Sequence, residues 1–180
     1  MAEPSKNEDA LLHDVQINAG KIVVLVVEDS ETDAFIIRHI LEQRMQRQCE
    51  FLHAINVSEA ENILNARDDT SIVLLDLGLP DSTGPRATYR SLEKFKERLP
   101  IVVLTSVEDR VTAIDIIEMG ALDYIYKQEI INQPESLPRA VEFAISRHHA
   151  QVKDKHEILD DLHQTEDFLQ FVTGGYSVKN

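Results

Sequence analysis

Residues 72–80 are Ile-Val-Leu-Leu-Asp-Leu-Gly-Leu-Pro, and the rest of the expected fold is built around this stretch. Its first four residues form an apolar run of strand length, and turn residues follow it. Such a run is typical of a parallel strand that helices bury on both faces. Asp76 is therefore expected at the carboxyl end of a buried strand, where the reactive groups of open α/β sheets lie.

Four other apolar runs predict strands in the same way, and an amphipathic helix follows each strand. These strands are expected at residues 22–27, 50–54, 101–104 and 121–126. Parallel strands need crossover helices, and right-handed crossovers leave few possible strand orders. The pattern therefore predicts a flavodoxin-like, doubly wound α/β fold with a five-stranded parallel sheet in the order 2-1-3-4-5, plus a C-terminal helical extension.

Several helix ends are marked by single residues. Ser30 is expected to cap the first helix, and either Asn56 or Ser58 begins the second. Pro85 is placed to open the third helix, and Gly120 to end the fourth.

Composition and charge narrow the range of functions. The chain has 180 residues, a formal net charge of −14 and one cysteine, Cys49. Nucleic-acid binding needs a basic face, a single cysteine fits a reducing compartment, and no stretch has the ~18 consecutive apolar residues of a membrane span. We expect a cytoplasmic protein that binds neither nucleic acid nor membrane. Its expected parts are a flexible arm at 1–20, an α/β domain at 21–148, and a helical extension and tail at 149–180.

Polar side chains stand at the expected carboxyl ends of four strands. They are Glu28 and Asp29, Asp76, Thr105 and Ser106, and Lys127. Because the first and third strands are neighbours in the predicted order, three carboxylates converge and need a cation between them. An all-oxygen ligand set suits Mg²⁺ or Mn²⁺ better than zinc. A hydroxyl and an ammonium then hold the oxygens of an incoming phosphoryl group, with Asp76 as its nucleophile.

Each of these residues also has an ordinary structural explanation. An acidic pair after a strand is often a solvated turn or a helix cap, and a lone Thr or Lys at a strand end carries little information. All of them together, at the ends of four alternating elements, favour a site.

These motifs resemble the receiver domain of two-component response regulators, over residues 21 to about 147. The stretch from Asp76 to Pro80, with Gly84 eight residues after Asp76, matches the loop of that family. The resemblance implies that Asp76 accepts a phosphoryl group from a sensor histidine kinase or a phosphotransfer protein. It also implies that Asp29, Asp76 and the Gly78 carbonyl bind Mg²⁺, with Glu28 acting largely through water.

The resemblance assigns roles on the other side of the site as well. Thr105 is implied as the switch hydroxyl and Lys127 as a phosphate ligand, with the small Ser106 leaving room for the phosphate. Tyr124 occupies the place of the aromatic that changes rotamer with the switch. An ordinary half-buried tyrosine at a strand edge is an equally open explanation for Tyr124.

Two features concern the details of the site. Receivers usually have a cis proline after the lysine, whereas Gln128 follows Lys127 here. A cis bond before a non-proline residue costs roughly 2.5–4 kcal/mol, so a trans bond and an altered loop are expected.

Neither Gly78 nor Val107 can orient a water molecule by hydrogen bonding. We therefore expect slow self-dephosphorylation.

The C-terminal region predicts a long helix, since no Pro or Gly interrupts it between Arg139 and Gly174. An apolar stripe runs along it and needs a partner, which could be a second copy, its own receiver or another protein. The stripe comprises Ile158, Leu162, Leu169 and Val172, widened by Leu159, Phe168 and Phe171. His156-Glu157 and His163 are interpreted as parts of a solvated helical face.

The leading hypothesis is a phospho-activated signalling switch that has no enzymatic or DNA-binding output of its own. A downstream protein or a homodimer would read the surface of its fourth helix (108–119), fifth strand (121–126) and fifth helix, together with the C-terminal helix. Two alternatives stay open. The chain could be a receiver-like interaction module that works without phosphorylation, or the receiver front end of a larger signalling enzyme.

Overall fold

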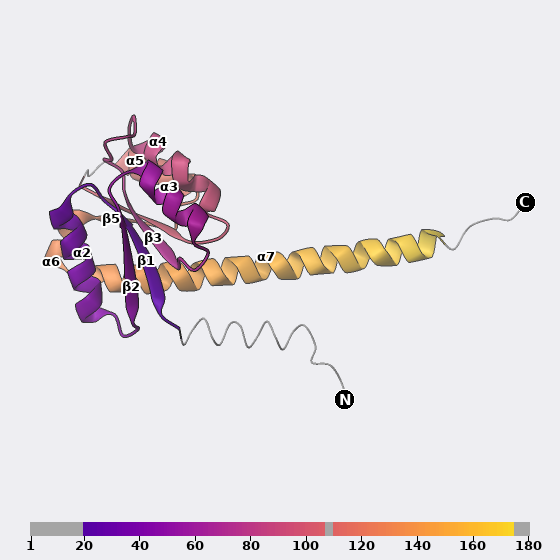
Figure 1. Ribbon diagram of the computed structural model, residues 1–180. Coiled ribbons are helices and arrows are strands. Elements are labelled where there is room, and N and C mark those ends of the chain that lie inside the picture. Colours follow the sequence, from indigo (N-terminus) through magenta and orange to yellow (C-terminus); the bar gives the residue numbers. More distant parts are fainter. Residues whose placement is uncertain (1–19, 107–109, 175–180) are drawn as a thin grey trace, which may run out of the picture. The chain divides into compact units, whose positions relative to one another are not determined.

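The computed structural model describes residues 20–106 and 110–174, and its centre is one parallel sheet. The strands are β1 (Ile22–Val27), β2 (Cys49–Ala54), β3 (Ile72–Asp76), β4 (Ile101–Thr105) and β5 (Asp123–Tyr126). They lie in the order β2-β1-β3-β4-β5, and helices cover both faces of the sheet (Figure 1). The predicted fold class and strand order are confirmed.

The connections between the strands are helical. The helices are α2 (Glu31–Arg44), α3 (Val57–Ala66), α4 (Pro85–Leu92), the 3-10 turn η1 (Glu93–Phe95), α5 (Arg110–Glu118), α6 (Lys127–Asn132) and α7 (Ser136–Gly174).

The sheet is buried on both faces because successive strand residues point to opposite sides and both sets are apolar. On one face, Leu25, Val73 and Leu75 pack with α3, α4 and α5. On the other, Val24 and Leu74 pack with α2, α6 and the part of α7 before Ser146. Each fully buried side chain of this kind stabilises the fold by about 1.5–3 kcal/mol. The carboxyl ends of the strands are thus held in a well-packed frame.

The expected helix caps are present. The Ser30 hydroxyl accepts a hydrogen bond from the N–H three residues further on, at 3.3 Å. Asn56, rather than Ser58, caps α3 in the same way at 2.8 Å. Pro85 opens α4, and Gly84 before it has a φ of +145°, a conformation that favours glycine.

The segment after Lys127 is helical, whereas the sequence predicts an altered loop. The peptide bond to Gln128 is trans, as predicted. A proline at this position would disfavour the helical conformation of Lys127, and glutamine removes that restriction. The helix α6 therefore begins at Lys127 and ends before Pro134, where the Gln133 N–H donates to the Glu129 carbonyl at 2.7 Å.

Several other boundaries differ from the prediction by one or two residues. The strand β2 begins at Cys49 rather than at residue 50, β4 ends at Thr105 rather than at residue 104, and β5 begins at Asp123 rather than at residue 121. The helix expected over 108–119 is described from Arg110, since residues 107–109 lie outside the described part, and it ends at Glu118. Gly120, with a φ of +110°, follows it after one further residue.

The chain divides into two compact units, one ending at Ile145 and the other beginning at Ser146. The first contains the sheet, and the second contains the remainder of α7, where Ile158, Leu159 and Leu162 are exposed. The boundaries expected from the sequence, 21–148 and 149–180, remain a prediction. The side chains of His163, Phe168, Leu169, Phe171 and Val172 lie outside the described set. Within the described residues, every helix is either too short or too polar to span a membrane.

Candidate functional site

A cavity of about 500 Å³ opens at the carboxyl ends of β1, β3, β4 and β5. All the predicted phosphate-binding and metal-binding residues line it. They are Glu28, Asp29, Asp76, Gly78, Thr105, Ser106 and Lys127. The strand order brings these residues together, because the carboxyl ends of parallel strands meet at one edge of the sheet.

Three carboxylates meet in this cavity. Glu28, Asp29 and Asp76 each offer an oxygen, and these oxygens lie within 4.8 Å of one another. Glu28 and Asp76 are buried, whereas Asp29 is exposed. A group of carboxylate oxygens of this kind, open to water on one side, fits a hard divalent cation such as Mg²⁺ or Mn²⁺.

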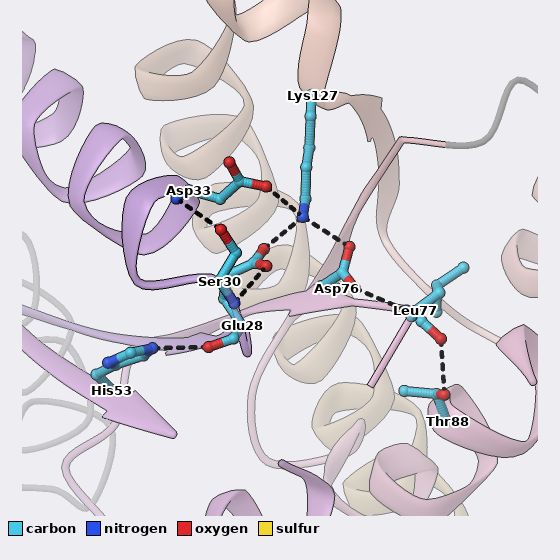
Figure 2. Close-up of polar contacts among 9 residues, drawn as sticks. Glu28, Ser30, Asp33, His53, Asp76, Leu77, Thr88 and Lys127 are labelled. Atoms are coloured by element: carbon cyan, nitrogen blue, oxygen red, sulfur yellow. Dashed lines mark hydrogen bonds and ion pairs between the residues drawn. The ribbon is translucent and has the colours of Figure 1, made fainter. Parts of the chain in front are cut away.

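Glu28 is held at both its backbone and its side chain (Figure 2). The His53 ring nitrogen Nε2 lies 2.8 Å from the Glu28 carbonyl oxygen, and the Ser30 N–H donates to Oε1 at 3.2 Å. The second carboxylate oxygen, Oε2, lies 2.6 Å from the ammonium of Lys127. Burial raises the pKa of Glu28 above its ordinary value, and the hydrogen bond from Lys127 opposes that rise.

Lys127 is surrounded by carboxylates (Figure 2). Besides Glu28, its Nζ lies 3.0 Å from Asp76 Oδ1 and 3.0 Å from Asp33 Oδ2. Burial alone would lower the pKa of Lys127, but hydrogen bonds to these three acids raise it well above the ordinary range. The ammonium therefore stays charged next to the expected phosphoryl acceptor.

Asp76 is held by its own loop. The Gly78 N–H donates to Asp76 Oδ2 at 2.7 Å, while Oδ1 faces Lys127. A Cβ atom at residue 78 would lie 3.0 Å from Asp76 Oδ2, which is tighter than most real Cβ contacts. A side chain here would push the carboxylate of Asp76 aside by a few tenths of an ångström, and glycine avoids that shift.

A hydrogen bond from Thr88 of α4 holds the loop after Asp76. The buried Thr88 hydroxyl donates to the Leu77 carbonyl at 2.9 Å (Figure 2). The side chains of Leu77 and Leu79 are buried in the core beneath the loop. Sequence reasoning missed Thr88, whose only local signal is a polar residue on the apolar face of a helix.

Asp33 was also missed as a part of the site. The sequence places it only in the first turn of the helix that Ser30 caps, whereas its carboxylate contacts Lys127. A signal was present in the sequence. Asp33 follows Asp29 by four residues in the first turn of a helix that begins at the site, and that position places its side chain near the strand ends.

Thr105 and Ser106 line the cavity from the end of β4, whereas Tyr124 of β5 is not among the residues that line it. Thr105 ends β4 and is buried, and Ser106 after it is exposed. Tyr124 on β5 is half-buried and packs edge-on against Tyr126, with ring centroids 5.4 Å apart. Val107 lies outside the described residues.

The chain matches the family model of the response regulator receiver domain over residues 24–142. The transcriptional regulatory protein RstA of Escherichia coli is 31% identical over 143 residues, which are 79% of this chain and 54% of that protein. The protein-glutamate methylesterase/protein-glutamine glutaminase 3 of Hahella chejuensis is 32% identical over 115 residues, which are 62% of this chain and 32% of that protein. The chain thus spans between a third and about half of the length of these curated relatives.

Solved structures share the fold. The BeF3-activated receiver domain of Klebsiella pneumoniae RstA has a TM-score of 0.54 and 26% identity, and it covers 70% of this chain and 98% of its own. The Mn²⁺-bound form of the response regulator Rcp1 has a TM-score of 0.52 and 24% identity, covering 67% and 88%. The family match, the strand order and the polar residues at the carboxyl edge agree: the chain belongs to the receiver domain family of two-component response regulators.

Proposed function

We propose that Asp76 accepts a phosphoryl group from a sensor histidine kinase or a phosphotransfer protein, and that this modification switches a protein-interaction surface. The observation that carries the proposal is the position of Asp76. Its buried carboxylate lies 3.0 Å from the Lys127 ammonium and beside two further acids, in a cavity open to a phosphodonor.

The transfer is a displacement at phosphorus. An oxygen of Asp76 forms a bond to phosphorus while the bond from phosphorus to the donor's imidazole nitrogen breaks, and the bonding electron pair returns to that nitrogen. Lys127 binds a phosphoryl oxygen, and the hydroxyl of Thr105 moves onto another. Ser106, which is small, leaves room for the group.

The same cavity would hold a divalent cation. Glu28, Asp29 and Asp76, with the Gly78 carbonyl, are the proposed ligands, and the Mn²⁺-bound neighbour supports a cation of this class in the fold. When bound, the cation supplies positive charge to the oxygens of the phosphoryl group.

The surface that reports the modification is proposed to be formed by α5, β5 and α7. Ile114 and Ile117 on α5 are exposed apolar residues available to a partner or to a second copy. Tyr124 is proposed to change rotamer with the switch. The absence of a DNA-binding or enzymatic output belongs to the same proposal and rests on the acidic charge alone, since the relatives include a transcriptional regulator and a methylesterase. A cytoplasmic location is part of the proposal as well, supported by the family.

The lengths of the relatives favour a second candidate. Since this chain corresponds to only a part of a transcriptional regulator and of a methylesterase, it could be the receiver part of a larger signalling protein. The phosphorylation chemistry of Asp76 is the same in both cases.

Intact-mass measurement tests the proposal. The full chain is incubated with Mg²⁺ and phosphoramidate, beside an Asp76→Asn variant. Wild type should gain the mass of one phosphoryl group and the variant none. If wild type gains no mass and its elution on size exclusion does not change with beryllofluoride, the chain is a phosphate-independent module instead.

The same sample gives the lifetime of the modification. Gly78 offers no side chain that could orient an attacking water, so the phosphoryl group should persist for minutes or longer. A lifetime of seconds on the isolated protein contradicts this expectation.

A further inference from the structure

Asp33 is an acid of the site, and it is not one of the site residues that the resemblance to receivers implies. It lies in the first turn of α2, and its Oδ2 is 3.0 Å from the Lys127 Nζ. Figure 2 shows Asp33 and Asp76 on opposite sides of the ammonium. The two carboxylates thus attract the same cation from two sides.

The ammonium of Lys127 already lies against three carboxylates. A lysine ammonium has three N–H donors, and the Lys127 Nζ lies 2.6 Å from Glu28 Oε2, 3.0 Å from Asp33 Oδ2 and 3.0 Å from Asp76 Oδ1. A phosphoryl group on Asp76 brings about two negative charges close to this ammonium, and its bond to the carboxylate removes the single charge of Asp76. Glu28 and Asp33 remain, so the oxygens of the phosphoryl group compete with these two carboxylates for Lys127.

The exposed fractions of the acid side chains indicate which carboxylate loses its contact with Lys127. The side chain of Glu28 is 2% exposed and that of Asp33 is 37% exposed. Leaving a buried carboxylate without its partner is strongly destabilising, whereas water can replace the partner of a half-exposed one at small cost. Asp33 is thus the carboxylate that Lys127 can leave.

We propose that Asp33 is a positioning residue that competes with the phosphoryl group for Lys127. In the unmodified protein, Asp33 holds the Lys127 ammonium between α2 and Asp76. When the phosphoryl group binds, Lys127 leaves Asp33 and pairs with a phosphoryl oxygen instead. This inference rests on the proposed function, because it needs an anion bound at Asp76.

The test compares two substitutions in the same turn of α2. Asp33→Asn removes the competing charge and keeps the shape of the side chain. Glu31→Gln is the matched control, because Glu31 is an exposed acid of the same first turn and both variants lose one charge near the same helix N-terminus. Both are made in the full chain, and thermal unfolding establishes that each is folded.

The affinity for beryllofluoride, with Mg²⁺ saturating, is measured by fluorine NMR. Asp33→Asn should bind it about two- to fivefold more tightly than wild type, the range that a partly exposed charge pair supplies. Glu31→Gln should bind like wild type. Equal or weaker binding by Asp33→Asn overturns the proposal, as does an equal gain in both variants.

The ammonium signal of Lys127 in lysine-labelled protein is a second readout that does not depend on phosphate chemistry. Without beryllofluoride it should shift in Asp33→Asn and not in Glu31→Gln. If wild type neither binds beryllofluoride nor accepts phosphate, the proposed function fails and the competition fails with it. If wild type does both while Asp33→Asn leaves the affinity unchanged, only the competition fails.

Discussion

The two ends of the sheet arrange their charges in opposite ways. At the amino end, one carboxylate is shared by two cations: Glu50 lies 2.5 Å from Lys21 and 2.8 Å from Arg67. At the carboxyl end, one cation, Lys127, is shared by three carboxylates. The first arrangement is partly exposed, and one of its cations, Arg67, also pairs with Asp69 at 2.6 Å, so that two cations serve two acids. The second is buried and has one cation for three acids.

The pKa directions follow this difference. Hydrogen bonds from Lys21 and Arg67 lower the pKa of Glu50, whereas burial raises that of Glu28. An acid with a lowered pKa is stabilised in its charged form by the fold, and one with a raised pKa is destabilised in it. The excess of buried acid at the carboxyl end thus opposes folding locally and favours cation binding, as expected of a functional site.

The strongest test of this contrast removes Lys127. Lys127→Ala should lower the free energy of unfolding by about 3 kcal/mol, because Glu28 is left as a buried charge without its partner. Urea unfolding at neutral pH with a chelator measures the loss, and Mg²⁺ should recover part of it. A loss similar to that of an exposed pair would mean that the two ends of the sheet do not differ.

The next effect concerns the loop that holds Asp76. Thr88→Val should cost about 2 kcal/mol, because the Leu77 carbonyl loses its donor while the shape is kept. Thr88→Ser retains the hydroxyl and serves as the matched control in the same urea experiment. If valine and serine unfold alike, the hydrogen bond to Leu77 does not support the loop.

Asp81 refines the comparison between the two ends of the sheet. It lies in the loop after the phosphoacceptor Asp76, and backbone N–H groups donate hydrogen bonds to its carboxylate. Its carboxylate accepts hydrogen bonds from Val57 and Ser58 at the start of α3, both at 3.0 Å. Burial raises the pKa of Asp81, but these hydrogen bonds outweigh it and lower the pKa overall. Asp81→Ala should therefore cost about 1 kcal/mol at neutral pH, as other helix caps do.

The pH dependence of that loss has a definite sign. A group whose folded pKa is lowered adds stability above its ordinary pKa, and that stability is lost as the pH falls through the folded value. The difference between wild type and Asp81→Ala should therefore shrink below about pH 4. A difference that grows on acidification contradicts the capping role.

The smallest effect is expected at the amino end. Lys21→Ala should change the free energy of unfolding by less than about 1 kcal/mol, because the pair with Glu50 is partly exposed and Arg67 remains. Unfolding in low and high salt measures it, and any loss should fall as salt rises. A loss as large as that of Lys127→Ala would remove the contrast.

Much of the fold was predictable because its signals are local. The apolar run before Asp76, the cap at Ser30 and the proline at 85 each act within one strand or one helical turn. The missed helix α6 shows the limit of such reasoning, since the absence of the usual proline predicted only an altered loop, whereas Gln128 permits a helix. The boundary of a short element depends on one or two residues and is therefore the least predictable feature.

The site was predictable only in outline. The sequence places Glu28, Asp29, Asp76 and Lys127 at strand ends, and a parallel sheet brings such ends to one edge. It does not show that Lys127 reaches Asp33, 94 residues earlier in the chain, or that Thr88 holds the loop. These contacts depend on the orientation of helices against the sheet.

Local propensity and hydrophobic periodicity are therefore enough to establish the α/β alternation and the identity of the acids at the strand ends, and the crossover rule narrows the strand order. Tertiary packing alone establishes which acids share Lys127, how deeply each is buried, and what holds the loop after Asp76. The physical reason is that propensities act over a few residues, whereas burial and ion pairing depend on segments that only the folded chain brings together.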